Sequence, residues 1–342
     1  MDKRNSASIL DQRKKDHIDL ALASQISAAT ADKRFYYEPI LSAFPLESAS
    51  FPTTIAGKKL NYPIWISSMT GGTSFAGLIN QRLAKVCKEF GLGMGLGSCR
   101  IILDNNQYLK DFSVRKYIGE EAPLFANLGI AQVEAVNRKG NWEVIHLLLK
   151  KLNADGLIIH VNPLQEWLQP EGDKIIIPPL ETIQAALINV GAPIIVKEVG
   201  QGMGPKSIDA LLRLPLEAIE FAALGGTNFS NLEIKRNDKS VATGDFNVIS
   251  TIGHTADEMI DFVNGAGSAL KSKMKCKKFI ISGGVKDFLD GYYFTQKLKY
   301  DALYGQASRF LGPAKKDYNT LYQFVRTQVA GLQLAYQYLS VR

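Results

Sequence analysis

A regular alternation of short apolar runs and helical segments, beginning near Asn61, constrains the fold of this chain more than any other feature. The eight runs occupy 62–67, 91–96, 123–126, 156–159, 193–196, 216–223, 279–281 and 300–303. Runs as continuously apolar as these are typical of parallel strands, which are buried on both faces. Helical patterns lie between them, for example over 78–90, 180–189 and 255–264.

Strands that alternate with helices indicate βαβ units. Eight such units over about 250 residues fit an α/β fold of the (β/α)8 barrel type better than an open sheet. The chain of 342 residues is therefore expected to form one barrel domain over 61–342, preceded by a basic segment over 1–60.

Both flanks carry helical patterns. Before the barrel, a helix is predicted over about 12–29, with Arg13, Lys14 and His17 near its start. Its apolar positions are Ile18, Leu22 and Ile26. After the barrel, a helix over about 319–339 is expected to pack on the outside through Leu321, Val325, Leu332 and Leu339.

Composition excludes several classes of protein. Hydrophobic residues make up 46% and charged residues 21%, which is too apolar for a disordered chain. The sequence holds no run of about 18 apolar residues, so we expect no membrane span, and no apolar stretch follows Met1 as a secretory signal would. The three cysteines cannot form a disulfide framework, which favours a cytoplasmic protein.

The net charge of +7, from 40 basic and 33 acidic residues, is modest. The densest basic run, 271–278, precedes an apolar strand and is typical of a solvated helix end, so we expect no nucleic-acid partner. A modest positive balance suits an enzyme with a phosphate or diphosphate substrate.

Polar residues follow the apolar runs, at the end of the barrel where active sites are built. The candidate site residues are Ser68, Met69, Thr70, Ser98, Asn127, His160, Asn162, Lys197, Thr227, Gly283 and Gly284. Gly283 and Gly284 follow the seventh strand and Gly305 ends the eighth, where barrels often bind phosphate through backbone N–H groups. Two ordinary tight turns are the alternative.

Lys197 ends a very apolar strand, where an ammonium group needs a partner. It could form a Schiff base or hold the anionic edge of a cofactor. A second glycine-rich stretch, 200–204, matches a dinucleotide fingerprint only superficially because Pro205 follows it, and a flexible active-site loop is expected instead.

His160 and Asn162 share one face at strand spacing, and Gln165 and Glu166 follow at once. One carboxylate with neutral oxygen and nitrogen donors suits Mg²⁺, which keeps water or substrate phosphate ligands, whereas zinc prefers more His or Cys. A histidine satisfied within the core is the alternative for His160. Cys99 also ends a strand but lacks a base, so a buried structural thiol is expected.

Taken in order, these motifs resemble the type 2, flavin-dependent isopentenyl diphosphate isomerases from about Arg13 to Arg309. The motifs are Arg13-Lys14-x-x-His17, Met69-Thr70-Gly71-Gly72, Gly97-Ser98-x-Arg100, Ala126-Asn127-Leu128-Gly129, His160-x-Asn162-x-x-Gln165-Glu166, Pro170-Glu171-Gly172-Asp173, Val196-Lys197-Glu198-Val199-Gly200, Gly225-Gly226-Thr227-Asn228 and Ser282-Gly283-Gly284.

The resemblance implies a barrel that binds FMN. It also implies that the protein is a homo-oligomer, either a tetramer or an octamer. FMN would contact Ser68, Met69, Thr70, Ser98, Asn127, Lys197, Thr227, Gly283, Gly284 and Ala307. The substrate would contact Arg13, Lys14, His17, Ser98, Arg100, His160, Asn162 and Gln165, and Glu166 would bind Mg²⁺. Gln165, His160 and Lys197 would be the catalytic residues.

The implied reaction moves a double bond, from isopentenyl to dimethylallyl diphosphate, with reduced FMN as acid and base and NADPH as its reductant. The amide of Gln165 is neutral, so it would orient the substrate or relay a proton. The basic N-terminal segment could close over the barrel mouth as a lid and exclude water.

Four positions depart from the pattern of that family. It usually has Ala at the position of Ser68, Gln at Cys99, Met at Gln306, and Ser or Gly near Ala222. An FMN-dependent α-hydroxy-acid oxidase or dehydrogenase is the alternative enzyme, although such enzymes place a strand-end His before Gly-Gly-Arg where this chain has Gly225-Gly226-Thr227. A flavin- or phosphate-binding barrel without catalysis is the other alternative.

Overall fold

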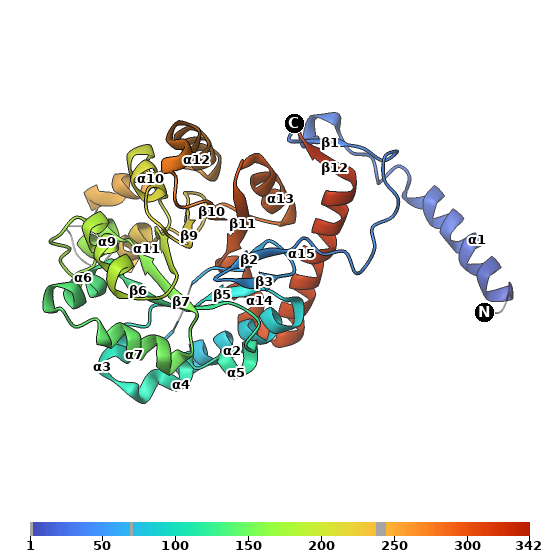
Figure 1. Cartoon of the computed structure of the whole chain (residues 1–342). Helices are drawn as coiled ribbons and strands as arrows, with labels where there is room; N and C mark the ends of the chain where they lie inside the picture. The colour runs from blue at the N-terminus through green and yellow to red at the C-terminus, as the bar shows by residue number, and fades with distance from the viewer. Residues whose placement is uncertain (1–2, 69–70, 237–243) are drawn as a thin grey trace.

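The computed structural model describes residues 3–68, 71–236 and 244–342, and its centre is a closed barrel of eight parallel strands (Figure 1). The barrel strands are β4 (Ile64–Ile66), β5 (Gly93–Gly95), β6 (Leu124–Gly129), β7 (Gly156–His160), β8 (Ile194–Lys197), β9 (Ala218–Glu220), β10 (Lys278–Ser282) and β11 (Asp301–Gln306). They neighbour one another in sequence order, and β11 closes the barrel against β4. Each predicted run overlaps one strand, so the barrel prediction is confirmed.

Helices surround the barrel. They are α2 (Ser74–Phe90), α3 (Ile101–Asp104), α4 (Leu109–Phe112), α5 (Arg115–Ile118), α6 (Ile130–Lys139), α7 (Glu143–Leu152), α8 (Pro163–Leu168), α9 (Pro179–Asn189), α10 (Pro205–Leu212), α11 (Phe229–Arg236), α12 (Ala256–Leu270), α13 (Phe288–Lys297), α14 (Ser308–Lys316) and α15 (Tyr318–Tyr338). Short 3-10 turns cover η1 (Ala28–Thr30), η2 (Asn106–Tyr108), η3 (Gly244–Thr251) and η4 (Lys271–Lys273). None of the helices in the described ranges is long and apolar enough to span a membrane.

Local sequence explains where the predicted helices begin. The Thr73 hydroxyl caps α2 by accepting the N–H of Ala76, and Thr255 and Glu258 form a capping box at the start of α12. At the other end of α2, Gly91 adopts a left-handed conformation and stops the helix.

The barrel interior is filled by inward-facing apolar side chains. They are Trp65, Phe125, Ile158, Ile195, Ala218, Ile280 and Leu303, with Ile55 and Leu60 added from outside the barrel. The last two belong to the hairpin of β2 (Thr53–Ile55) and β3 (Lys58–Leu60), which closes the N-terminal end of the barrel. Glu217 holds this hairpin by accepting the N–H of Ala56 at 2.8 Å. The interior is therefore a packed core that is closed at one end.

The C-terminal helix packs on the outside as predicted. Leu321, Val325 and Leu332 of α15 are buried. Leu339 was expected in this helix but begins β12 (Leu339–Val341), which pairs with β1 (Phe35–Tyr37). The two-stranded sheet ties the lead-in segment to the end of the chain, and both lie side by side in Figure 1.

The prediction of an N-terminal helix over 12–29 was wrong in its boundaries. The helix α1 spans Lys3–Leu20, and a turn follows in which the N–H of Ser24 bonds to Leu20 O. Ile18, Leu22 and Ile26 are 77%, 82% and 85% exposed, so no packing extends the helix. Ser27, in an extended conformation, instead caps the 3-10 turn η1.

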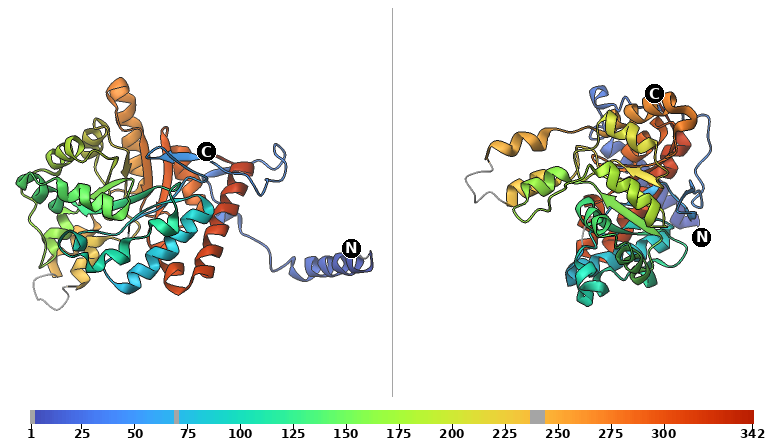
Figure 2. Two further views of the ribbon diagram at one scale, coloured as in Figure 1. Left: turned by 60° about the horizontal axis from the view of Figure 1, so that its bottom comes forward. Right: turned by 60° about the vertical axis from the view of Figure 1, so that its left-hand side comes forward.

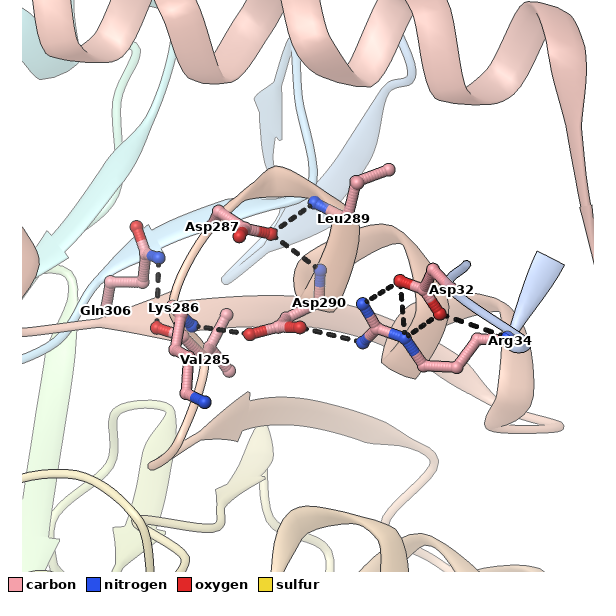
Figure 3. Close-up of polar contacts among 8 residues, drawn as sticks. All are labelled: Asp32, Arg34, Val285, Lys286, Asp287, Leu289, Asp290 and Gln306. Atoms are coloured by element: carbon pink, nitrogen blue, oxygen red, sulfur yellow. Dashed lines mark hydrogen bonds and ion pairs between the residues drawn. The ribbon is translucent and has the colours of Figure 1, made fainter. Parts of the chain in front are cut away.

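Helix α1 projects away from the barrel in Figure 1 and in the left view of Figure 2. Arg34 joins this segment to the barrel domain, because its guanidinium pairs with Asp32 and with Asp290 of α13 at 2.7 Å each (Figure 3). These carboxylates raise the pKa of Arg34. Asp290 also accepts the N–H of Lys286, so the anchor reaches the loop after β10. Helix α1 therefore extends away from its own barrel.

Candidate active site

The floor of the site is a ring of side chains one inward position above the apolar core. Because side chains alternate along a strand, the residue two positions after each of the seven barrel core residues also points inward, and so does Gly95, two positions after the inward-facing Gly93. These residues are Ser67, Gly95, Asn127, His160, Lys197, Glu220, Ser282 and Gly305. Every one is polar or glycine, so the barrel changes from an apolar interior to a polar mouth within one layer.

A cavity opens above this floor, over β8, β9, β10, β11 and the end of β4. Its lining includes Ser67, Ser68, Lys197, Glu220, Gly225, Gly226, Thr227, Ser282, Gly283, Gly284, Lys286, Gln306, Ala307 and Arg309. Six predicted cofactor residues line this one cavity: Ser68, Lys197, Thr227, Gly283, Gly284 and Ala307. Ser98 and Asn127 are not among its lining residues. Met69 and Thr70 lie outside the described residues.

The glycine loops after β9 and β10 touch each other at one end of this cavity. Gly283 has a φ of 87°, and a Cβ on it would collide with the Ala223 carbonyl. A Cβ on Gly226 would lie 3.3 Å from the Gly283 Cα. No side chain caps α14, which begins after Ala307 at the same end. Bare backbone, a helix N-terminus and Arg309 together form a place for a phosphate group.

Lys197 of β8 also lines this cavity. Its Nζ donates to Glu198 O at 2.7 Å, and its side chain is buried. The Glu198 carboxylate turns away and accepts the N–H groups of Gly200, Gln201 and Gly202 at 2.6–2.9 Å. These bonds hold the glycine-rich loop that the sequence predicted to be flexible. Burial raises the pKa of Glu198, and the three N–H donors oppose that rise.

His160 and Asn127 form a hydrogen-bonded pair beside Lys197. His160 Nδ1 lies 2.8 Å from Asn127 Oδ1, and the Asn127 amide donates to Leu96 O at 3.1 Å. Burial, and then the charge of Lys197, lower the pKa of His160 to about 3. The imidazole is therefore neutral at physiological pH and can act as a hydrogen-bond partner but not as a cation.

This low pKa predicts a loss of stability in acid. Unfolding returns His160 to an ordinary pKa of about 6.5, so the unfolded chain binds an extra proton as the pH falls below that value. The contribution is complete above pH 6.5 and is lost on acidification toward the folded pKa, by about 2 kcal/mol between about pH 7 and pH 5. Urea unfolding of His160→Asn should lack this component, and the exposed His146→Asn should retain it. Equal pH dependence in His160→Asn and the unsubstituted protein would contradict it.

Asn162, Gln165 and Glu166 gather at the start of α8. The Asn162 amide donates to Gln165 Oε1 at 3.1 Å and to Glu166 Oε1 at 3.0 Å. Glu166 Oε2 accepts the N–H of Asp173 at 2.7 Å, and Asn162 is buried. The Glu166 carboxylate is thus held in one orientation. Among the described residues no group of three His, Cys, Asp or Glu forms a metal cage, so a cation here would take most of its ligands from water or substrate.

Arg100 lies at the outer edge of this cluster. It pairs with Asp173 at 2.5 Å, is 53% exposed, and shares Asp173 with the Gln132 amide.

Ser98 is exposed two residues before Arg100, whereas Cys99 is fully buried, and burial raises the pKa of its thiol to about 12. Cys99 is therefore the structural thiol that was predicted.

Sequence reasoning missed two buried acids. Glu233 of α11 accepts the Gln165 amide at 3.2 Å and pairs with Arg236 at 2.5 Å. Glu220 forms part of the floor. Neither ends an apolar run as a motif residue would, although Glu220, an acidic residue inside the apolar run 216–223, was a signal.

Of the predicted residues, Arg13, Lys14 and His17 are not brought to the site, because they lie exposed on α1.

A polar mouth above a packed (β/α)8 barrel is the arrangement in which barrel enzymes build their active sites. A flavocytochrome b2 variant with sulfite bound superposes with a TM-score of 0.59 at 13% identity, over 88% of this chain and 71% of that one. A mandelate oxidase variant with a monooxide FMN adduct superposes with a TM-score of 0.55 at 12% identity, over 91% and 88%. At such low identity these likenesses show the fold alone.

Curated relatives show the family. The isopentenyl-diphosphate delta-isomerase of Rickettsia peacockii (strain Rustic) is 32% identical over 330 residues, covering 94% of this chain and 92% of that protein. The enzyme of the same name from Nostoc sp. (strain PCC 7120) is 33% identical over 282 residues, covering 81% and 77%. No protein-family model matches. The chain belongs to the isopentenyl-diphosphate delta-isomerase family.

Proposed function

We propose that this enzyme isomerises isopentenyl and dimethylallyl diphosphate with bound reduced FMN, NADPH as reductant and Mg²⁺. The observation that carries the proposal is one cavity lined by the phosphate cradle and by Lys197. Lys197 is level with His160 of β7, and β7 leads into α8 with its Gln165 and Glu166. These parts match a phosphorylated planar cofactor lying below a diphosphate substrate.

The residues present fit FMN. The glycine loops and the start of α14 would hold its phosphate, and Lys197 would face the electron-rich edge of its ring. The buried hydroxyls of Ser67 and Ser68 and the Gln306 Oε1 have no hydrogen-bond partner among the described residues, so the floor retains polar atoms for a ligand. Ser98, Asn127 and Thr227 would complete the contacts, and the reduced ring supplies a nitrogen that gives and takes the proton.

The substrate diphosphate would bind above, near Arg100, His160 and Asn162. Neutral His160 can donate a hydrogen bond, and Arg100 can leave Asp173 to bind the diphosphate in bidentate fashion. Glu166 would place Mg²⁺ beside the diphosphate with water filling the other positions. Gln165 would then face the isoprenoid carbons and keep the reacting carbon in position.

The N-terminal cations complete this proposal through a second copy of the chain. Arg13, Lys14 and His17 are expected to bind the diphosphate, yet α1 projects away from its own barrel (Figure 2, left). Large apolar residues of the same segment are exposed, including Ile18, Leu22 and Ile26. A homo-oligomer in which α1 reaches a neighbouring barrel would cover these residues and deliver the cations.

Glu233 should assist Gln165 through its negative charge. We expect Glu233→Gln, which keeps the size of the side chain, to lower kcat about tenfold with little change in KM, because the carboxylate polarises the Gln165 amide during proton movement. The control is Glu171→Gln, since exposed Glu171 also pairs with Arg236, at 2.7 Å, without touching Gln165. A rise in KM with unchanged kcat would show that Glu233 only shapes the binding site.

The α-hydroxy-acid oxidase alternative is less well supported. The loop 225–227 after β9 carries neither the His nor the Arg that such enzymes place there. The two functions differ in what happens to oxidised FMN under anaerobic conditions. Isopentenyl diphosphate alone should leave the absorbance of oxidised FMN unchanged, and NADPH should bleach it. Lactate or mandelate alone should also leave this absorbance unchanged. Bleaching by a hydroxy acid alone would favour the oxidase.

A further inference from the structure

Three inward side chains stand in register on neighbouring strands of the floor. His160 of β7 is level with Lys197 of β8, and Lys197 is level with Glu220 of β9. Lys197 and Glu220 both line the cavity. His160 is neutral because its pKa is lowered to about 3, so the row contains one cation and one carboxylate.

Glu220 is fully buried and only half bonded. Its Oε1 accepts the Ser282 hydroxyl at 3.1 Å, and Ser282 Oγ in turn accepts the N–H of Ala222 at 2.9 Å. Its Oε2 has no hydrogen-bond partner in the part of the chain that the structure describes. A carboxylate oxygen in this state is costly, so a role connected with a bound ligand accounts for it better than packing does.

Other charges do not replace this carboxylate. Glu198 follows Lys197 but faces away, and its carboxylate is occupied by backbone N–H groups. Lys286 and Arg309 also line the cavity, with the glycine loops and the start of α14. Among the described residues that line the cavity, Glu220 is the one acid. It therefore decides how positive the floor is beneath a ligand.

We propose that Glu220 is a positioning residue that offsets the charge of Lys197 and thereby limits the preference of the floor for the anionic form of reduced FMN. This inference rests on the proposed FMN function. Reduced flavin exists as a neutral and an anionic form, and an unopposed lysine would favour the anion. A proton-transfer site needs the ring to keep its proton until the substrate takes it, so a balanced pair serves this chemistry better than a lone cation.

The test compares dissociation constants of oxidised and reduced FMN, measured anaerobically by equilibrium dialysis at a pH where free reduced FMN is anionic. The ratio of the oxidised to the reduced constant should rise about tenfold in Glu220→Gln, because one negative charge beside the ring is removed. Glu220→Asp keeps the charge and should remain close to the unsubstituted protein. Lys197→Met should lower the ratio about tenfold, since Glu220 is then unopposed.

An unchanged ratio in Glu220→Gln, with FMN bound, overturns this inference alone. Thermal unfolding of each variant shows whether the barrel is intact, and if Glu220→Gln does not fold, a Lys197→Met ratio equal to that of the unsubstituted protein overturns the inference independently. An unsubstituted protein that binds neither form of FMN overturns the proposed function and this inference together. The ratio is used because a merely structural Glu220 would weaken both forms equally.

Discussion

Replacement of Glu166 by glutamine is expected to lower the isomerisation rate about 100-fold at physiological Mg²⁺ concentration. Glutamine preserves the size of the side chain and can still bond to Asn162 and to the N–H of Asp173, but it removes the one negative charge positioned for the cation. Steady-state rates measured across a Mg²⁺ titration should show a higher half-saturating concentration and partial recovery at high Mg²⁺.

The Mg²⁺ dependence separates this explanation from a general disturbance of α8. Glu171→Gln changes a nearby exposed carboxylate that pairs with Arg236, and it should leave both the rate and the Mg²⁺ titration close to those of the unsubstituted enzyme. A rate loss in Glu166→Gln with an unaltered Mg²⁺ titration would mean that Glu166 does not bind the cation.

The double replacement Arg13→Ala/Lys14→Ala should raise KM for isopentenyl diphosphate about 100-fold. Two charge-assisted hydrogen bonds to the diphosphate would be lost, each worth about 1.5 kcal/mol or more. FMN binding should not change, because none of the described residues that line the cavity belongs to α1. Lys15→Ala, an exposed lysine on the same helix, is the matched control and should behave as the unsubstituted enzyme.

Mixing these two impaired variants, assayed at a substrate concentration far below the raised KM, then shows whose N-terminal segment completes the site. Subunits carrying Arg13→Ala/Lys14→Ala have an intact Glu166, and subunits carrying Glu166→Gln have intact N-terminal cations. If α1 acts on a neighbouring barrel, unfolding and refolding the mixture should recover activity, because some barrels receive every group. If it acts on its own barrel, no subunit is complete and the mixture keeps the low activity of the separate variants, which would contradict the proposed arrangement.

The barrel was predictable because its strands are buried on both faces and so appear as apolar runs that periodicity detects. Strand-end residues such as Lys197 and Asn127 were also predictable, because the end of each apolar run marks the end of a strand and therefore the position of the residues at the barrel mouth. The hairpin of β2 and β3 was not predicted, because Thr53–Ile55 and Lys58–Leu60 contribute only Ile55 and Leu60 to the core. Six residues with two buried side chains give no periodic signal.

The site was less predictable where contacts join distant segments. Glu233 meets Gln165 across 68 positions of sequence, and nothing local to either residue indicates that pairing. At Glu198 the sequence predicted more mobility than the structure shows. The loop 200–204 looks mobile from its glycines, but a carboxylate two residues before it holds three of its N–H groups. Glycine-rich composition describes what a backbone can do, whereas hydrogen bonds determine what it does.

An anaerobic product assay tests the central claim most directly. The purified protein is incubated with FMN, Mg²⁺, NADPH and isopentenyl diphosphate, and the products are separated by mass-resolved chromatography. We expect dimethylallyl diphosphate to form in the complete mixture. With protein that has first been freed of flavin, no product should form when either FMN or NADPH is left out of the mixture. Product formed without flavin, or no product from protein with reduced FMN bound, would contradict the account.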